Sequence, residues 1–278
     1  MKVAVIILNY NSSDDCRKCV SFLKRQKGVE LELVLVDNCS PDGNKVEALC
    51  REQGCTFIAN PENRGYNAGN NIGLRYAAEK GYKYALIANP DMEFPQTDYV
   101  KRLVEVMEQD ENVVVVGSDI IHADGFHQNP IKPDRGVKDS YNWIFNKFQK
   151  HKGTKTYDEN TDDYKHSKYC QKLSGCCFLI SLKFANKIGF FDEHVFLFCE
   201  EAILSKQVLL HRKKMFYVAT TIAKHQHIRK QKTPKEKQLK QWLKSRLYFE
   251  KKYNTNNIFQ YLFVKCLWII RYIIIKSK

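Results

Sequence analysis

The first half of the chain repeats one pattern, in which an apolar run is followed by polar residues and then by a segment of helical periodicity. Near-continuous apolar runs are typical of parallel strands that are covered on both faces. Five such runs occur, at residues 3–8, 31–36, 56–59, 84–88 and 113–116. Helical patterns lie between them, at residues 14–26, 44–53, 67–80 and 96–108. The alternation predicts an α/β fold with a Rossmann-like, mostly parallel central sheet flanked by helices.

Polar residues follow these apolar runs where each predicted strand reaches its carboxyl end. The run at residues 84–88, for example, leads directly into Asn89, Pro90 and Asp91. Ligands of open α/β sheets bind at the carboxyl ends of the strands. The positions after the other strands hold Asn9 and Asn11, Asp37 and Asn38, and the polar segment 60–71. The pattern therefore predicts a ligand site at this edge of the sheet.

Regular periodicity stops between residues 122 and 170, where Asp, Lys, Asn and Tyr predominate. A long irregular segment inside a compact domain is usually a functional loop or a disordered one, so we expect a mobile insertion beside the site. Residues 173–193 then predict a strand and a short helix, and residues 197–219 predict a helix and a strand. We divide the chain into a main domain, 1–230, with halves 1–95 and 96–230, and a helical basic extension, 231–278.

The extension has two helical segments of different character. The first is rich in lysine and sets Leu239, Trp242, Leu243 and Leu247 on one stripe, and the second is a hydrophobic run interrupted only by Lys265 and Arg271. These two charges argue against a lipid-exposed span. We expect a basic amphipathic surface on an anionic leaflet, with Trp268, Ile269, Ile270 and residues 272–275 inserted at the interface. The alternative is a helix packed on the main domain or on a second subunit.

Composition narrows the class of protein. The 278 residues are 44% hydrophobic and carry a formal net charge of +14, so the chain is globular with an anionic partner: nucleic acid, an acidic membrane or a phosphorylated small molecule. The ten cysteines have no zinc-site spacing and no export signal precedes them, which favours reduced thiols in a cytoplasmic protein. Cys16 and Cys19 are expected on a helix face rather than as a redox pair.

Three of the strand-end stretches hold groups with recognisable chemistry. Asp37 and Asn38 can hydrogen-bond a base or ribose. The turn after residue 60 supplies Arg64 and Gly65 ahead of a helix amino terminus, which favours anions. Asp91 is a hard oxygen ligand suited to Mg²⁺ or Mn²⁺, and a diphosphate-bearing substrate would supply further ligands.

Five stretches resemble, in this order, the motifs of family 2 nucleotide-sugar glycosyltransferases of the rhamnosyltransferase-like branch: VIILNYNSSD, LVDNCSPDG, NRGYNAGNNIGL, IANPD and GFFDEHVFLFCEE. The likeness spans roughly residues 3–227. It implies a GT-A fold, a nucleoside-diphosphate sugar donor such as dTDP-rhamnose or a UDP-sugar, a divalent cation, and inversion at the anomeric carbon. The implied acceptor is a glycan or lipid-linked glycan of a bacterial surface polysaccharide, and the implied location is cytoplasmic, peripherally associated with the inner face of the cytoplasmic membrane.

The resemblance also implies roles for single residues. The donor-binding set it gives is Asn9, Asn11, Asp37, Asn38, Arg64, Gly65, Asn70 and Asn89. Asp91 and His225 take the metal-binding positions. The first aspartate of the family's metal motif is Asn89 here, so Asp91 is the sole carboxylate of the usual pair.

The general base falls in the second half of the chain. Direct displacement of a nucleoside diphosphate needs a carboxylate that takes the proton of the acceptor hydroxyl. The stretch FCEEAILS resembles the family's acidic pair, with Glu201 at the base position and Glu200 beside it. The family more often has Asp at the base position, so Glu201 extends about one methylene further and Glu200 stays a competitor.

Other interpretations stay open at the level of sequence. Asn, Asp and Pro are common turn formers, and acidic residues are common at helix amino termini, so each motif alone has a purely structural explanation. A nucleotidyltransferase would also place carboxylates and a cation at strand ends, but NYNSSD lacks its glycine and lysine signature. A basic nucleic-acid-binding protein fits the charge, yet no RRM, KH or zinc signature occurs, so we expect no nucleic-acid partner. A homodimer remains open.

Overall fold

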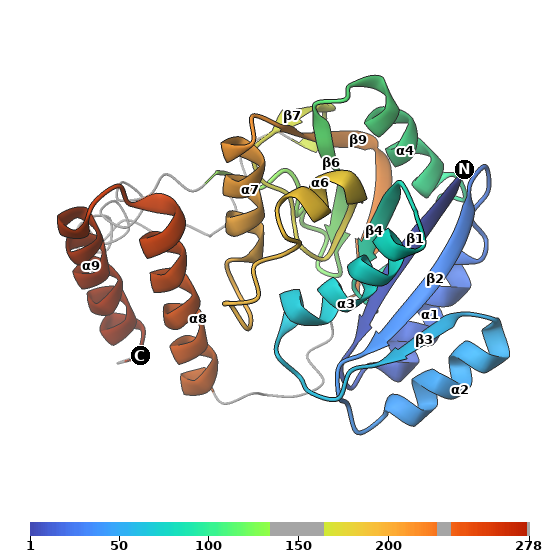
Figure 1. The fold of residues 1–278 in the computed structure, drawn as a ribbon, viewed down its shortest axis with the longest axis horizontal. Helices are drawn as coiled ribbons and strands as arrows, with labels where there is room; N and C mark the ends of the chain where they lie inside the picture. The colour runs from blue at the N-terminus through green and yellow to red at the C-terminus, as the bar shows by residue number, and fades with distance from the viewer. Residues whose placement is uncertain (134–163, 227–234, 277–278) are drawn as a thin grey trace.

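The structure is a computed structural model that describes residues 1–133, 164–226 and 235–276. Within these residues, nine strands form one sheet in the order β3-β2-β1-β4-β8-β6-β9-β5, with β7 paired to β9 (Figure 1). The strands are β1 (Lys2–Asn9), β2 (Glu30–Asp37), β3 (Thr56–Ala59), β4 (Tyr84–Ala88), β5 (Met92–Glu93), β6 (Val113–His122), β7 (Lys168–Cys170), β8 (Cys177–Ser181) and β9 (Lys214–His225). The strands and helices expected from the sequence are thus present.

Helices cover both faces of this sheet. They are α1 (Ser13–Leu23), α2 (Gly43–Gln53), α3 (Tyr66–Glu79), α4 (Tyr99–Gln109), α6 (Leu182–Lys187) and α7 (Glu200–Leu210), followed by α8 (Lys235–Phe249), the π-helix η2 (Glu250–Asn254) and α9 (Ile258–Lys276). Apolar residues of α1, α2 and α4 join one core cluster, and those of α3, α6 and α7 join the other. The sheet therefore lies between two helical layers, which explains why its central strands are apolar on both faces.

The two halves of the sheet differ in strand direction. The first four strands pair in parallel, in the order β3, β2, β1, β4, as the alternation predicts. β8 then pairs antiparallel with both β4 and β6, while β6 and β9 are parallel. The result is a mixed sheet in which the parallel strands and the second half of the sheet join at β4 and β8.

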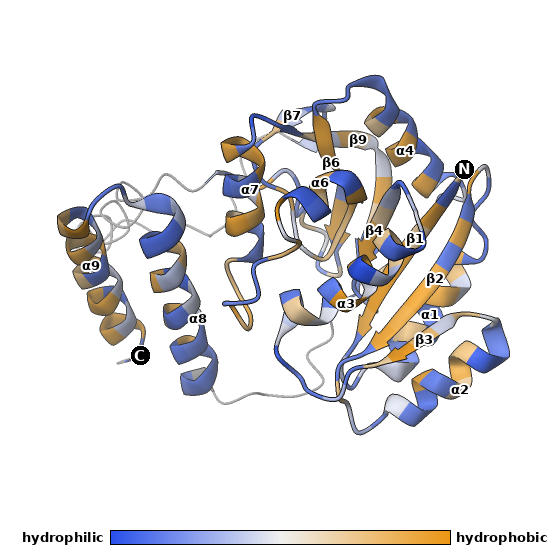
Figure 2. Cartoon of the chain, viewed as in Figure 1, coloured by the Kyte–Doolittle hydropathy of each residue, from blue (hydrophilic) through white to orange (hydrophobic). Residues whose placement is uncertain are grey.

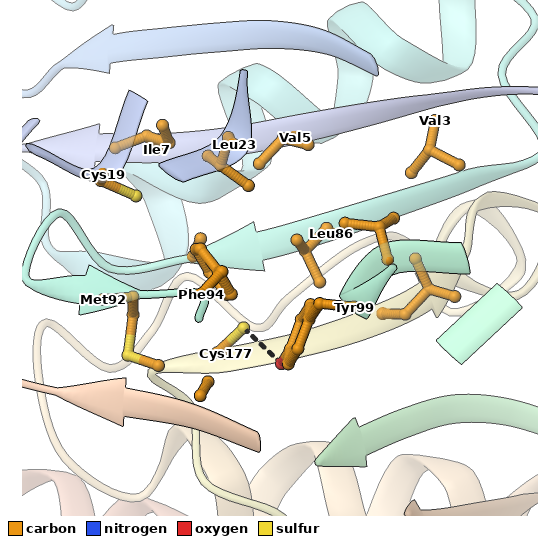
Figure 3. Close-up of a cluster of buried hydrophobic side chains, with 14 of the residues drawn as sticks. Val3, Val5, Ile7, Cys19, Leu23, Leu86, Met92, Phe94, Tyr99 and Cys177 are labelled. Atoms are coloured by element: carbon orange, nitrogen blue, oxygen red, sulfur yellow. Dashed lines mark hydrogen bonds between the residues drawn. The ribbon is translucent and has the colours of Figure 1, made fainter. Parts of the chain in front are cut away.

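The core shows why β1 and β4 occupy the centre. Alternate β1 residues Val3, Val5 and Ile7 are fully buried toward the helix layer that holds α4, where Tyr99 also lies (Figure 3). The buried Tyr99 hydroxyl hydrogen-bonds with Ser118 Oγ at 2.9 Å and Cys177 Sγ at 3.3 Å, so burying it leaves no polar atom unsatisfied.

Cys16 and Cys19 lie on a helix face, as the sequence predicts. Cys16 and Cys19 are buried on α1 and pack in the same core cluster. All ten cysteines are free thiols. Burial raises the pKa of Cys50 to about 12, which keeps that thiol protonated and unreactive.

The ends of the irregular segment lie close to where the sequence pattern places them. β6 continues to His122, and the segment re-enters the sheet at β7. Residues 134–163, where we expect the mobile insertion, lie outside the described residues.

The C-terminal extension forms a helical pair beside the main body, on the side of α7 (Figure 1). α9 is predominantly hydrophobic and α8 predominantly hydrophilic (Figure 2). One expectation is wrong: Trp268 is not part of an outer insertion surface, because it is 3% exposed and faces α8. Its indole donates a hydrogen bond to the buried Glu250, which fixes its direction.

Candidate active site

The carboxyl ends of β1 and β2 are joined by a network centred on Asn9, which is fully buried. Its amide nitrogen lies 2.8 Å from Asp37 Oδ1, 2.8 Å from Ser40 Oγ and 3.2 Å from Asp42 Oδ1. Its amide oxygen accepts the Ser12 N–H at 3.0 Å. These contacts use most of the hydrogen-bonding capacity of Asn9. In the structure Asn9 therefore holds two turns together, and its direct contact with a donor stays a prediction.

Asn11 and Asp42 shape the same pair of turns. Asn11 has a φ of 56°, a left-handed conformation that asparagine tolerates better than most residues. Asp42 Oδ2 accepts the Ser13 N–H at 2.9 Å, at the start of α1. Burial alone would raise the pKa of Asp42, but hydrogen bonds from Ser13 and Asn9 lower it, so this carboxylate is charged near a helix amino terminus.

Asn38 links the end of β2 to the polar loop that precedes α3. Its amide nitrogen donates to Asn63 Oδ1 at 3.0 Å, and its oxygen accepts the Asn60 amide at 2.8 Å. Asp37 accepts the Ser40 N–H at 3.1 Å and is 6% exposed. The two residues predicted to bind the base and ribose are thus side by side, each anchored by neighbouring turns.

Gly65 is the point at which the loop before α3 meets the loop before α7. Its φ is 104°, and a Cβ at this position would lie 2.3 Å from the carbonyl oxygen of Phe196. The next residue, Tyr66, donates its backbone N–H to the same oxygen at 2.8 Å. Only glycine fits both the conformation and the space.

The two remaining residues of the predicted loop differ in exposure. The Arg64 side chain is 61% exposed and lies 3.8 Å from Glu193, so its guanidinium is open to an anionic ligand. Asn70 is 1% exposed and donates to the Tyr66 carbonyl oxygen at 3.0 Å within α3. Arg64 is therefore available to a ligand, whereas Asn70 supports the helix.

The end of β4 brings Asp91 against His225, two residues 134 positions apart in the sequence. Met92 of β5 pairs with His225 of β9, and this register sets Asp91 Oδ1 3.2 Å from His225 Nε2. Both side chains are largely buried. Burial alone would lower the pKa of His225, but Asp91 and Cys176 raise it to about 10, so the imidazole is positively charged near pH 7.

Asp91 and His225 fit a divalent cation as a two-ligand site. Both atoms face the same sheet edge, and a bound cation would replace the proton on His225 as the positive partner of Asp91. Among the described residues no group of three His, Cys, Asp or Glu side chains converges. The donor set is thus one carboxylate and one imidazole, which leaves the remaining ligands to substrate oxygens and water.

Glu201 is tied to the same edge through the two residues that precede β8, Gly175 and Cys176. Gly175 donates its N–H to Glu201 Oε1 at 3.2 Å, and the next residue, Cys176, accepts the Asn89 N–H at 2.8 Å. The Tyr66 hydroxyl lies 2.7 Å from the Gly175 carbonyl and 3.1 Å from Asn89 Oδ1. Since a hydroxyl carries one hydrogen, Tyr66 donates to one of these oxygens at a time.

Glu200 has a different environment from its neighbour. It lines a small pocket, and its Oε2 has no hydrogen-bond partner among the described residues. Burial and the nearby charge of Glu201 raise the pKa of Glu200 to about 8. Near pH 7 Glu200 is therefore mainly protonated, whereas Glu201 accepts the Gly175 N–H.

The backbone before α7 is held in an uncommon shape. Phe198 and Cys199 have positive φ values of 72° and 67°, and α7 begins directly after them at Glu200. Consecutive non-glycine residues in this region cost free energy that the surrounding contacts must offset. The strain lies immediately before the two candidate carboxylates.

Sequence reasoning missed several residues that complete the site. The most prominent are Tyr66, Gly175 and Asp42, which link the predicted residues to one another. Tyr66 and Asp42 lie inside the stretches NRGYNAGNNIGL and LVDNCSPDG, so proximity to a motif was an available signal. Gly175 acts through its backbone, and no sequence pattern reports that.

The chain is similar to proteins of glycan and polysaccharide biosynthesis. The chain is 26% identical over 200 residues to the low-salt glycan biosynthesis hexosyltransferase Agl10 of Haloferax volcanii, covering 72% of this chain and 59% of that protein. It is 28% identical over 125 residues to the succinoglycan biosynthesis protein ExoO of Rhizobium meliloti, covering 44% of this chain and 35% of ExoO. The chain thus spans less than two thirds of each relative.

A solved structure shows the same fold. The mannosyltransferase PcManGT of Pyrobaculum calidifontis, in complex with GDP-Man and Mn²⁺, superposes with a TM-score of 0.60 at 15% identity, covering 95% of this chain and 68% of that one. This likeness confirms the expected GT-A fold. Residues 4–170, more than half of the chain, match the sequence profile of Glycosyl transferase family 2. The chain therefore belongs to Glycosyl transferase family 2.

Proposed function

We propose that the chain transfers a hexosyl group from a nucleoside-diphosphate sugar to a hydroxyl of a glycan acceptor, with inversion at the anomeric carbon. One observation carries the proposal: Glu201 is linked through Gly175, Cys176 and Asn89 to the edge that holds Asp91 and His225. The names of Agl10 and ExoO, both in glycan or polysaccharide biosynthesis, support a role of this kind.

The reaction needs one base and one leaving-group site. Glu201 takes the proton of the acceptor hydroxyl while the hydroxyl oxygen forms a bond to the anomeric carbon of the donor sugar. The bond from that carbon to the diphosphate breaks at the same time. The nucleoside diphosphate leaves with the electron pair. Asp91 and His225 would hold Mg²⁺ or Mn²⁺, which stabilises negative charge on the diphosphate when bound. Arg64 lies exposed where it can pair with a phosphate.

The donor edge fits a nucleotide. Asp37 and Asn38 lie together after β2, in the position from which a carboxylate and an amide bind base and ribose. A dTDP-sugar such as dTDP-rhamnose, or a UDP-sugar, is the donor we propose, and a lipid-linked bacterial surface glycan is the acceptor. The mannosyltransferase neighbour was crystallised with GDP-Man, so a GDP-sugar is included as the alternative donor to be tested.

A donor panel tests the proposal. UDP-, dTDP- and GDP-sugars are screened by thermal shift with and without MnCl₂, because a ligand at one hundred times its Kd stabilises by about 2.7 kcal/mol. The sugar product from the binding donor is then examined by NMR. We expect one nucleotide class to raise Tm, more so with the cation, and a product of inverted configuration. Retention of configuration, or no shift with any nucleotide, contradicts the proposal.

A further inference from the structure

The outer face of α9 is apolar, and no other described residue covers it. Its large exposed side chains recur at intervals of three, four or seven residues, and they are Phe259 (80% exposed), Leu262, Phe263, Ile270 and Ile273, with Ile258 at the start of the helix. This spacing places them on one side of the helix. Val264 and Trp268 lie on the opposite side and are buried. α9 therefore has apolar residues on two sides, and one of these apolar sides faces solvent.

Two of the three charged residues of α9, Arg271 and Lys276, interact with α8. Arg271 is turned toward α8, where its guanidinium lies 5.3 Å from the Trp242 ring and 4.8 Å from the Trp268 ring. Lys276, at the end of α9, forms a 2.9 Å ion pair with Glu236, at the start of α8. The sequence expectation that Arg271 breaks the apolar run is therefore wrong for the outer face, since packing on α8 removes this charge from it.

The helical pair is strongly basic around this apolar face. Residues 235–276 contain ten Lys and Arg residues and two Glu residues. Lys237, Lys240 and Lys244 are exposed along α8. These lysines add positive charge to the helical pair that carries the outer face of α9, and this charge attracts an anionic partner. A partner with an apolar interior and an anionic surface matches both features.

We propose that the outer face of α9 docks on an anionic lipid bilayer, with the helix lying in the plane of the interface. Phe259, Phe263 and their apolar neighbours enter the acyl boundary, and the positive charge of the helical pair is attracted to acidic headgroups. A second copy of the chain is a poorer match, because it would bring two strongly basic helical pairs together.

The contacts between α8 and α9 determine the orientation. By length and composition α9 could cross a membrane, since it has 19 residues and a mean hydropathy of 1.8 over its most apolar window. Crossing would separate Trp268 and Arg271 from α8 and expose the guanidinium to hydrocarbon, which is costly. α8 cannot accompany α9, because its lysines are exposed. A helix lying flat keeps every one of these contacts.

The same helical pair is fastened to the loop that precedes α7. Asp192 Oδ2 accepts from Tyr248 at 2.8 Å, Lys252 at 2.9 Å and Tyr253 at 2.6 Å. Ser245 donates to the Leu197 carbonyl at 2.7 Å. Docked α9 would thus hold the loop before Glu200 at a fixed orientation to the membrane, a consequence that rests on the proposed function.

Vesicle sedimentation of the full chain tests the docking. Phosphatidylcholine vesicles are compared with vesicles that also contain phosphatidylglycerol, without nucleotide, so that the result is independent of transferase activity. The wild type should sediment with the anionic vesicles, and binding should weaken in high salt. The double variant Phe259→Ser/Phe263→Ser should bind at least about tenfold more weakly, because two exposed aromatic anchors are removed. Leu210→Ser, at an exposed leucine that ends α7, is the matched control and should bind like wild type.

A charge variant and two further measurements complete the experiment. Lys240→Glu/Lys244→Glu should lose the preference for anionic vesicles, since each basic residue near such a surface strengthens binding about fivefold. Circular dichroism confirms that each variant is folded. Unchanged binding of the double phenylalanine variant overturns the proposal. So does a light-scattering result in which the wild type is a dimer and that variant a monomer, or resistance of the bound protein to alkaline carbonate, which indicates a spanning helix.

Discussion

The strand edge at the candidate active site and the α8–α9 helical pair both bury charged side chains, but they use them differently. In the helical pair, Glu250 is fully buried and accepts from Arg246 at 2.8 Å, Trp268 at 3.1 Å and Asn254 at 2.7 Å. At the strand edge, Asp91 and His225 keep part of their surface exposed, and Glu201 accepts one backbone N–H. In the helical pair the buried charge has all its partners within the pair, whereas at the strand edge the charged side chains can still bind a ligand.

Structural and functional polar clusters differ in whether all partners of a buried polar group lie within the same part of the protein. A buried charge whose every partner belongs to the same helical pair stabilises that pair. Asn9 and Asn38 resemble Glu250 in this respect, although they lie within the candidate active site. Residues that hold the site together and residues that touch the substrate should therefore give different results when they are changed.

The largest effect is expected at Asp91. Asp91→Ala removes the only carboxylate of the proposed cation site, so donor affinity and turnover should both fall while the fold remains intact. Lost charge stabilisation costs about 10²–10³-fold and lost metal affinity about 10–100-fold, so kcat/KM should fall about 10⁴-fold. Steady-state kinetics across a Mn²⁺ titration measure this. Wild-type turnover of the variant in the presence of a chelator would refute the cation site.

Glu201 should give a loss confined to turnover. Glu201→Gln keeps the shape but removes the base, so kcat should fall on the order of 10²–10⁴-fold while donor Kd stays nearly constant. Glu201→Asp restores the commoner family residue with a shorter reach and should be partly active. Glu200→Gln is the comparison variant. If it loses activity while Glu201→Gln does not, the base is Glu200, and if both stay active the base lies elsewhere.

In the helical pair, Glu250→Gln should destabilise without removing chemistry. It leaves Arg246, which is 8% exposed, without its buried counter-charge. Breaking such a pair costs about 3 kcal/mol or more. Urea denaturation followed by tryptophan fluorescence measures the loss, since Trp242 and Trp268 both lie in this pair. Turnover of a short soluble acceptor should change little. A stability equal to wild type would show that the ion pair contributes nothing.

A pH dependence of stability is expected at Glu200. The pKa of Glu200 in the folded state, about 8, lies above its value in the unfolded chain. Its contribution to the free energy of unfolding is therefore most favourable at low pH and is lost as pH rises through about 8. Glu200→Gln removes the cost of ionising this buried carboxyl. The variant should therefore gain Tm relative to wild type between about pH 5 and pH 9, by about 2–4 °C for each kcal/mol recovered. A pH-independent difference would contradict the assigned environment.

The sequence alone determined the parts of this protein that depend on local pattern. Strand β4 at residues 84–88 and strand β3 at residues 56–59 were predicted to the residue, because uninterrupted apolar runs bounded by turn formers have one stable use in an α/β sheet. The meeting of Asp37, Asn38 and Asp91 at one edge followed from the same rule, since parallel strands end on the same side. Family motifs then pointed to His225 and Glu201.

Tertiary structure alone decided which atoms remain available. The sequence cannot show that the Asn9 amide hydrogen-bonds to Asp37 and Ser40, or that the Gly175 backbone N–H donates to Glu201. These contacts join segments that are far apart in the chain. It also assigned Trp268 to the outside of the tail. An apolar helix has no intrinsic inner face, and only packing against α8, with Arg271 stacked on the tryptophans, determines which side stays open.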